Sequence, residues 1–305
     1  MSVDSASPKA LLHAAYRMLA APEGEADPQR AVEMVRAACA QGSTEAWRYN
    51  ATFAALGIGQ PQSVETAFAS LGRAAALGDE AAAAQLKILA PSGNFDAAAW
   101  FAPSPTIQYC DSPRLYTVEG FLGKAACDWF IRAARPRLEP VRIKTPDGGP
   151  VIHPTRNNSG AGFSPLARDL VVQMTRLRMA AALGLPVACQ EDTNVLHYGP
   201  GQEYKRHYDF ITPGEEHGFA DELRLVGQRV VTLLVYLNDD YEGGETEFPR
   251  LNWRYKGKAG DALIFWNLSA AGEREPFSLH GGLPVIRGEK WLLSQWVRQR
   301  PTPLR

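Results

Sequence analysis

The sequence has no long apolar segment, no leading signal pattern and no excess of charge of one sign. Its longest apolar run is 230–237, interrupted by Thr232, whereas a membrane-spanning helix needs about 20 such residues. The first nine residues lack the basic and then apolar stretches of a secretory signal. With 32 Lys and Arg against 33 Asp and Glu, the net charge is −1, so we expect neither a nucleic-acid nor a membrane partner.

Cysteine is scarce and never paired in sequence. The four residues are Cys39, Cys110, Cys127 and Cys189, and no two form a Cys-x-x-Cys motif. This argues against a disulfide framework and favours reduced thiols in a cytoplasmic protein. Hydrophobic residues make up 45% and charged residues 21% of the 305 positions, which is typical of a folded chain with room for two domains.

The first 90 residues are rich in alanine, which favours helix. Prolines and glycines divide them into five helix-length segments, with breaks near 22–24, 42, 57–61 and 78. Small residues recur with a period of 36: Ala31, Ala38, Ala40, Gly42 and Ala46 return as Ala67, Ala74, Ala76, Gly78 and Ala82. This region, assigned to residues 1–95, resembles the helical-hairpin repeats related to tetratricopeptides. Such repeats often bind a partner protein, and packing against the downstream domain is the alternative.

Residues 96–305 follow a different pattern and form the second predicted domain. Helices are predicted at 118–135 and 164–183. Beyond about residue 190, short β-branched and aromatic runs alternate with Gly, Pro and Asn. These runs are 193–198, 204–210, 229–237, 262–265 and 291–297. Short strands without intervening helices indicate an antiparallel barrel or jelly roll, so the expected class is α+β after an all-α repeat region.

A candidate metal site centres on His207 and Asp209. Side chains two apart on a strand share a face, so both could hold one ion, and His280 fits as a third ligand. Two histidines and a carboxylate on one face of an octahedral ion are the ligands of non-haem Fe(II) oxygenases. A zinc hydrolase with the same ligands is the alternative, but the sequence has no His-Glu-x-x-His motif.

Lys290 opens a predicted strand on which Leu292, Ser294 and Trp296 share its face. A lysine inside an apolar barrel is costly unless it meets an anion. A dicarboxylate that chelates the metal at one end would supply this anion at its other end. The alternative is a solvated lysine at the end of the strand.

Five ordered segments carry the remaining motifs: 195–209, 228–238, 243–249, 260–267 and 280–296. Together they resemble the 2-oxoglutarate- and Fe(II)-dependent dioxygenases of the prolyl 4-hydroxylase family. The resemblance implies Fe(II), 2-oxoglutarate and O₂, with ascorbate as reductant. It implies hydroxylation of a prolyl residue in a peptide or protein, with release of succinate and CO₂. The alternatives are a free amino acid or small metabolite as substrate, or a catalytically silent scaffold that binds a partner through its repeats.

The resemblance also implies which residues hold the cofactors. The iron ligands are His207, Asp209 and His280. Lys290 pairs with the far carboxylate of 2-oxoglutarate, and Tyr198 donates a hydrogen bond to the same cosubstrate. Thr232 and Tyr236 share a strand face and are predicted to line its cavity, with core packing as the alternative for both.

A further set is implied to face the target peptide: Tyr204, Arg156, Glu191, Arg229, Trp296 and Arg298. Two departures from the family concern this set. Arg156 begins an Arg-Asn-Asn segment where the family has Arg-Thr-Ser, and Arg298 stands where the family often has histidine. We therefore expect the iron chemistry to follow the family more closely than the choice of substrate does.

Overall fold

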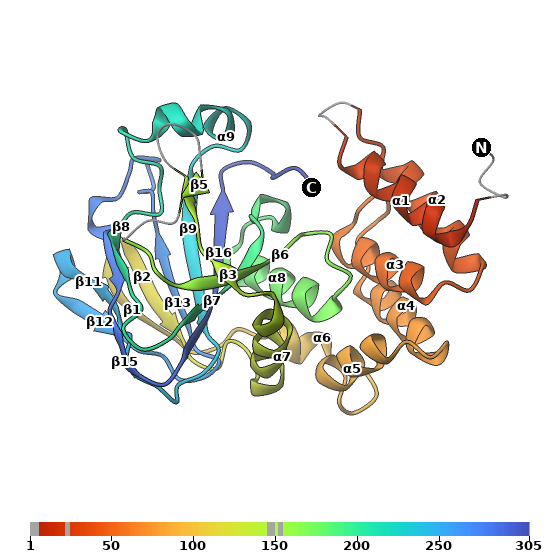
Figure 1. Cartoon of the computed structure of the whole chain (residues 1–305), viewed down its shortest axis with the longest axis horizontal. Coiled ribbons are helices and arrows are strands. Elements are labelled where there is room, and N and C mark those ends of the chain that lie inside the picture. Colours follow the sequence, from red (N-terminus) through yellow and green to blue (C-terminus); the bar gives the residue numbers. More distant parts are fainter. Residues whose placement is uncertain (1–5, 22–24, 145–149, 152–154, 305) are drawn as a thin grey trace. The chain divides into compact units, whose positions relative to one another are not determined.

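The structure is a computed structural model that describes residues 6–21, 25–144, 150–151 and 155–304. The chain divides into two compact units, coloured along the sequence in Figure 1. One comprises residues 1–102, 164–187 and 303–305, and the other 103–163 and 188–302. The proposed domain boundary after residue 95 stays a prediction. In the described part of the chain, no helix is both long enough and apolar enough to cross a membrane.

The first unit is helical, as the alanine-rich sequence predicts. Its helices are α1 (Pro8–Leu19), α2 (Pro28–Ala40), α3 (Thr44–Leu56), α4 (Val64–Ala76), α5 (Glu80–Leu89), α6 (Ala97–Phe101) and α8 (Leu170–Leu183). At the start of each, a Ser or Asp side chain accepts a hydrogen bond from a backbone N–H of the first turn. The five predicted N-terminal segments are therefore all helices.

The 36-residue repeat appears in the packing of these helices. Six of its matched alanines are 0% exposed: Ala31, Ala38, Ala46, Ala67, Ala74 and Ala82. Small side chains at these positions let neighbouring helices approach closely. Gly42 and Gly78 follow α2 and α4 with φ of 84° and 92°, a left-handed conformation that glycine adopts without strain. The region is thus consistent with a helical repeat.

The second unit contains two main antiparallel sheets. The larger has the strand order β1-β2-β13-β9-β16-β7-β6-β3, and the smaller has β12-β11-β14-β8. The larger comprises β1 (Thr106–Asp111), β2 (Arg114–Val118), β3 (Glu139–Pro140), β6 (Ser159–Phe163), β7 (Thr193–Tyr198), β9 (Arg229–Tyr236), β13 (Ala262–Trp266) and β16 (Lys290–Arg298). The smaller comprises β8 (Tyr204–His207), β11 (Thr246–Phe248), β12 (Trp253–Tyr255) and β14 (His280–Gly282).

Along the chain, the strands of this unit pass repeatedly between the two sheets. The larger sheet holds β7, β9, β13 and β16, and the smaller holds β8, β11, β12 and β14. This connectivity is that of a jelly roll, which confirms the predicted α+β class.

The second unit also contains shorter elements. Two are the helices α7 (Lys124–Ala134) and α9 (Ala220–Leu225). Two antiparallel strand pairs complete it: β10 (Glu242–Gly243) with β15 (Val285–Arg287), and β4 (Ile143–Lys144) with β5 (Pro150–Val151).

Three elements differ from the prediction by three or more residues at one end. The helix expected at 118–135 begins at Lys124, because residue 118 still belongs to β2. The helix expected at 164–183 begins at Leu170, since the Asp169 side chain accepts hydrogen bonds from the first backbone N–H groups. The strand expected at 204–210 ends at His207, so Asp209 lies in the loop that follows it.

Apolar side chains from both sheets form the core of the jelly roll. The cluster includes Leu196, Leu234, Phe248, Phe265 and Leu292, each at most 7% exposed. Burial of this apolar surface stabilises the pairing of the sheets, and it leaves a dry interior in which polar side chains interact strongly.

Candidate functional site

Two histidines face each other across neighbouring strands of the smaller sheet. His207 at the end of β8 pairs in register with His280 at the start of β14. Asp209 lies between them: its Oδ1 is 3.6 Å from Nε2 of His207, and its Oδ2 is 3.6 Å from Nε2 of His280. Two atoms that each bind an ion at about 2.1 Å can be at most about 4.2 Å apart. The three side chains therefore offer donor atoms at distances that suit one metal ion.

Backbone carbonyls hold both imidazole rings in orientation. Nδ1 of His207 lies 2.8 Å from the carbonyl oxygen of Lys205, and Nδ1 of His280 lies 2.9 Å from that of Ser278. A carbonyl only accepts hydrogen bonds, so each Nδ1 carries the proton and each Nε2 is the candidate donor atom to a metal. Burial and the neighbouring His207 lower the pKa of His280 to about 4, which keeps this ring neutral at pH 7.

The Asp209 carboxylate is fixed by its own hydrogen bonds. The Thr232 hydroxyl donates to Oδ2 at 2.6 Å, and Nδ2 of Asn267 donates to the Thr232 hydroxyl at 2.9 Å. Burial alone would raise the pKa of Asp209, but the two histidines and Thr232 lower it far below its usual range. The aspartate is therefore charged and oriented before any cation binds.

Lys290 and Tyr198 are cross-strand neighbours on β16 and β7 of the larger sheet. Lys290 is 2% exposed, and its ammonium donates to the carbonyl of Gly244 at 2.7 Å. Burial lowers its pKa to about 7, although Glu245 opposes the shift. Its Nζ lies 5.4 Å from the ring centre of Tyr198 and 5.6 Å from that of Tyr236. A buried ammonium among aromatic rings is a site for an anion.

One cavity between the sheets connects the metal-binding side chains with the lysine. It is lined by His207, Asp209 and His280 and by Tyr198 and Lys290, together with Arg156, Leu196, Tyr204, Leu234, Thr246, Gly281, Gly282, Leu292, Ser294 and Trp296. Both sheets contribute to it: the smaller sheet carries the histidines, and the larger carries the lysine.

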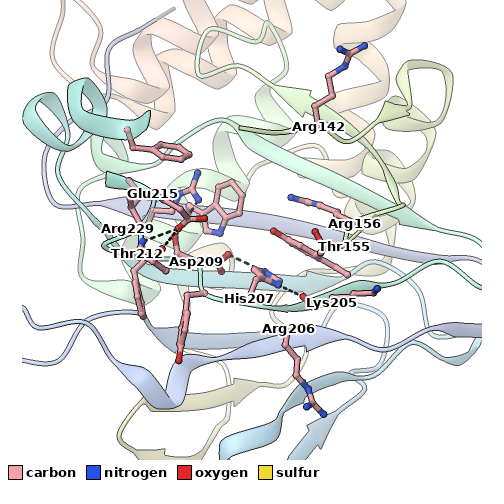
Figure 2. A pocket seen from close by; sticks show the side chains of 16 residues that line it. Arg142, Thr155, Arg156, Lys205, Arg206, His207, Asp209, Thr212, Glu215 and Arg229 are labelled. Atoms are coloured by element: carbon pink, nitrogen blue, oxygen red, sulfur yellow. Dashed lines mark hydrogen bonds and ion pairs between the residues drawn. The ribbon is translucent and has the colours of Figure 1, made fainter. Parts of the chain in front are cut away.

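A wider cleft of about 490 Å³ opens outside His207 and Asp209 (Figure 2). Besides these two, three side chains line both the cleft and the inner cavity: Arg156, Tyr204 and Trp296. The Tyr204 ring stacks on His207 with centroids 3.5 Å apart, and the Arg156 guanidinium lies 4.3 Å above the Tyr204 ring. A substrate in the cleft would therefore reach the metal-binding side chains.

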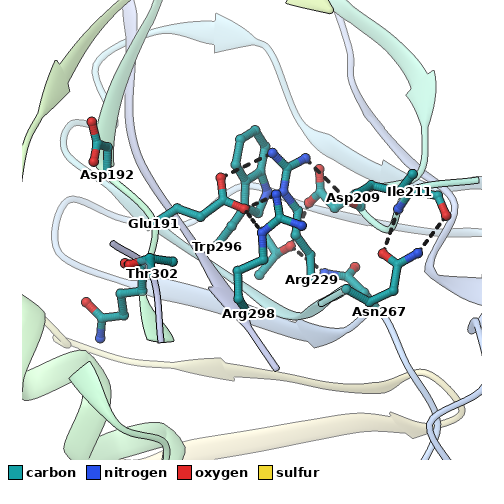
Figure 3. Close-up of polar contacts among 12 residues, drawn as sticks. Glu191, Asp192, Asp209, Ile211, Arg229, Asn267, Trp296, Arg298 and Thr302 are labelled. Carbon is teal, nitrogen blue, oxygen red and sulfur yellow. Dashed lines mark hydrogen bonds and ion pairs between the residues drawn. The ribbon is translucent and has the colours of Figure 1, made fainter. Parts of the chain in front are cut away.

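A charged network supports one wall of this cleft (Figure 3). Glu191 accepts hydrogen bonds from Arg229 at 2.8 and 3.2 Å, and its Oε1 lies 2.5 Å from Nε of Arg298. The Arg229 guanidinium lies 3.6 Å from the ring centre of Trp296. Burial opposes ionisation of Glu191, but the two guanidinium groups lower its pKa. Three of the predicted peptide-facing residues thus form one ion-paired unit, and the fourth, Trp296, packs against its Arg229 guanidinium.

Comparison with known proteins agrees with this geometry. A profile described as the 2OG-Fe(II) oxygenase superfamily matches residues 193–298. Prolyl 4-hydroxylase 1 of Arabidopsis thaliana is 36% identical over 210 residues, which cover 63% of this chain and 71% of the relative. The chain belongs to the prolyl 4-hydroxylase family.

Other members of the prolyl 4-hydroxylase family match a similar part of the chain. Probable prolyl 4-hydroxylase 7 of the same plant is 33% identical over 215 residues, 65% of this chain and 66% of the relative. The chain therefore spans about two thirds of the length of that relative. Among solved structures, the viral collagen prolyl hydroxylase vCPH from Paramecium Bursaria Chlorella virus-1, described as a 2OG complex, is 32% identical with a TM-score of 0.49. That match covers 62% of this chain and 98% of the viral chain.

The donors in this chain fit the iron and 2-oxoglutarate for which the superfamily is named. Two imidazoles and one carboxylate are the ligand set of non-haem Fe(II) oxygenases. The Lys290 ammonium fits the second carboxylate of a dicarboxylate whose first end binds the metal. The prediction that this site joins two histidines, an aspartate and a lysine through one cavity agrees with the structure.

Two predicted cosubstrate residues contact other side chains in this structure. Thr232 binds the Asp209 carboxylate, and Tyr236 hydrogen-bonds Thr246 at 2.8 Å and lies beside Lys290. Neither is among the described residues that line the inner cavity. Their shared strand face was predicted correctly, but the residue of that face that lines the cavity is Leu234.

Glu191 and Arg298 are likewise absent from the described lining of the cleft. Glu191 pairs with Arg229, which lines the cleft, and Arg298 pairs with Glu191. Sequence reasoning missed Thr246, which lines the inner cavity from β11. Thr246 and Phe248, two residue types that favour strands, were the available signal for β11.

Proposed function

We propose that this chain is an Fe(II)- and 2-oxoglutarate-dependent hydroxylase that acts on a prolyl residue of a peptide or protein. The observation that carries the proposal is the single cavity lined both by three metal-binding side chains and by a buried lysine. The open cleft beside His207 has room for several residues of a peptide. Membership of the prolyl 4-hydroxylase family supports proline as the target.

In this proposal, the iron ligands are Nε2 of His207, Nε2 of His280 and the carboxylate of Asp209. Bound iron and 2-oxoglutarate would supply the oxidising chemistry, in which O₂ is consumed, the substrate gains a hydroxyl group, and succinate and CO₂ are released. The chain orients the ligands through two backbone carbonyls and Thr232. This prior orientation lowers the entropic cost of assembling the site.

Lys290 and Tyr198 would hold 2-oxoglutarate. The ammonium lines the same cavity as the metal-binding side chains, and there it would pair with the far carboxylate. Leu196, Leu234 and Leu292 line the same cavity. These apolar walls exclude water, which strengthens the ion pair at Lys290.

The target peptide would lie in the outer cleft. Tyr204, Arg156 and Trp296 line the passage from the cleft to the inner cavity, so they would contact the prolyl residue. Arg229 lines the same cleft, with its guanidinium held flat over Trp296 by Glu191. Glu191 and Arg298 would act as positioning residues.

Turnover without a peptide tests the enzyme proposal first. Purified protein with Fe(II), 2-oxoglutarate and ascorbate should release succinate slowly, and His207→Ala should abolish this release. Addition of proline-containing peptides should increase succinate release and add one oxygen atom to the peptide, as seen by mass spectrometry. If the protein neither releases succinate nor binds 2-oxoglutarate, the alternative of a catalytically silent scaffold replaces the proposal.

We also propose that the helical repeats of the first unit bind a partner protein. Tyr16 and Leu77 support this, because their large side chains are 43% and 41% exposed, and exposed apolar groups often mark interaction sites. Affinity capture with the full chain and with Leu77→Asp would test it, and an unchanged set of captured proteins would contradict a site at Leu77.

Ascorbate as reductant and a cytoplasmic location complete the proposal. The role of ascorbate follows from the family resemblance. An equal number of turnovers with and without ascorbate would contradict this role. The free thiols of Cys39, Cys110, Cys127 and Cys189 suit a reducing compartment. Fractionation of cells with an antibody to the chain would test the location.

A further inference from the structure

The outer cleft carries more positive than negative side chains. Its cationic lining residues are Arg142, Arg156, Lys205, Arg206 and Arg229, and its carboxylates are Asp209 and Glu215. Because the whole chain has a net charge of −1, this excess is a local feature of the cleft.

Two of the five cations already have a carboxylate partner behind the cleft wall. Arg206 pairs with Glu247 at 2.8 Å, and Arg229 pairs with Glu191 at 2.8 Å. Three cations have no such partner among the residues that the structure describes: Arg142, Arg156 and Lys205. The charge that remains available to a ligand is therefore concentrated on these three.

These three side chains lie on the same side of His207, and Glu215 lies on the other (Figure 2). Arg142 and Lys205 are exposed, whereas Arg156 is 6% exposed and packs over Tyr204. Glu215 accepts hydrogen bonds from the backbone N–H and the hydroxyl of Thr212 at 3.0 and 2.6 Å. One side of the cleft thus offers two solvated cations to a bound chain.

The cofactors would not cancel this charge. In the proposed complex, the two charges of Fe(II) and the one of Lys290 balance Asp209 and the two carboxylates of 2-oxoglutarate. The field along the cleft then depends on its own rim residues, and a cleft lined by one sign of charge attracts ligands of the other sign.

We propose that the peptide bound in this cleft is acidic, with Asp or Glu side chains over Arg142 and Lys205. That these acidic residues flank a target proline rests on the proposed function. The peptide binding itself does not, because it depends only on the rim of the cleft.

Fluorescence anisotropy with matched peptides tests the proposal. Each labelled peptide contains one proline, with two Glu or two Gln residues on either its N-terminal or its C-terminal flank. For one of the two flanks, the Glu peptide should bind the full-length protein about tenfold more tightly than the Gln peptide, the effect of two weak exposed ion pairs. This preference should decrease as salt is added, since exposed charges are screened over about 3 Å at 1 M.

Paired variants locate the preference on the rim. Arg142→Gln with Lys205→Gln should reduce it to less than about twofold, whereas Lys258→Gln, an exposed control outside the cleft lining, should retain it. Equal binding of Glu and Gln peptides, or a preference that survives the double substitution, would overturn the inference. Mass spectrometry of the same peptides judges the proposed function separately, because an acidic peptide can bind without being hydroxylated.

Discussion

Replacement of Lys290 by methionine should stabilise the protein and weaken cosubstrate binding at once. The lysine is buried, and its pKa falls from 10.5 to about 7 on folding. Between these values the unfolded chain holds a proton that the folded chain has lost, so stability rises with pH across this window. At pH 7 the shift corresponds to a cost of about 4 kcal/mol, at 1.36 kcal/mol per pH unit.

The variant would recover only part of this cost. Loss of the ammonium leaves the Gly244 carbonyl without its 2.7 Å hydrogen bond, a penalty of about 1–3 kcal/mol. The expected net gain in free energy of unfolding is therefore about 1–3 kcal/mol at pH 7. The gain should decrease towards pH 10, because in the unsubstituted protein Lys290 then begins to lose its proton in the unfolded state as well as in the folded state. Urea unfolding at several pH values measures it.

The same substitution should weaken 2-oxoglutarate binding by about 30- to 1000-fold, since loss of one partner of a buried ion pair costs about 2–4 kcal/mol. Anaerobic calorimetry with Mn(II) in place of Fe(II) measures this affinity. Lys258→Met, at an exposed position, is the matched control and should change neither quantity. If Lys290→Met loses stability and keeps its affinity within twofold, Lys290 is a structural residue and the reasoning is refuted.

Three further predictions concern the metal end of the site and its support. Thr232→Val should weaken Mn(II) binding by about tenfold in a calorimetric titration, because the Asp209 carboxylate loses its 2.6 Å hydrogen bond; unchanged affinity would contradict this positioning role. Mn(II) at 100 times its Kd should raise the free energy of unfolding by about 2.7 kcal/mol. Asp209→Ala should abolish this gain in stability, and an equal gain in the variant would show that the ion binds elsewhere. Glu191→Gln should lower the free energy of unfolding by about 2–4 kcal/mol and raise the KM for a peptide substrate, because the buried Arg298 and the half-buried Arg229 lose their counter-charge. An unchanged KM would show that Glu191 does not support the cleft.

Strand periodicity predicted much of the site but not its contacts. Lys290, Leu292, Ser294 and Trp296 share one face of β16, and all four line the inner cavity. On β9 the same rule was insufficient, because Thr232 and Tyr236 share a face and yet meet different partners, Asp209 and Thr246. Which residue on a face reaches a cavity depends on the opposite sheet, and a single sequence does not reveal that packing.

Loops and long-range pairs were the least predictable features. Asp209 was expected beside His207 through strand alternation, but β8 ends at His207 and the following bend brings the carboxylate back. The pairing of β8 with β14 joins residues more than 70 positions apart, which local patterns do not encode. The helices of the first unit were easier to predict, because alanine content, N-cap residues and Gly42 determine the local backbone within a few positions along the chain.

The most direct test of the account is a crystal structure of the full chain with Mn(II) and 2-oxoglutarate. We expect one ion bound by Nε2 of His207, Nε2 of His280 and a carboxylate oxygen of Asp209. We also expect the remote carboxylate of the cosubstrate within hydrogen-bond distance of Nζ of Lys290. An ion held by other side chains, or a cosubstrate that leaves Lys290 paired only with Gly244, would contradict the central claim.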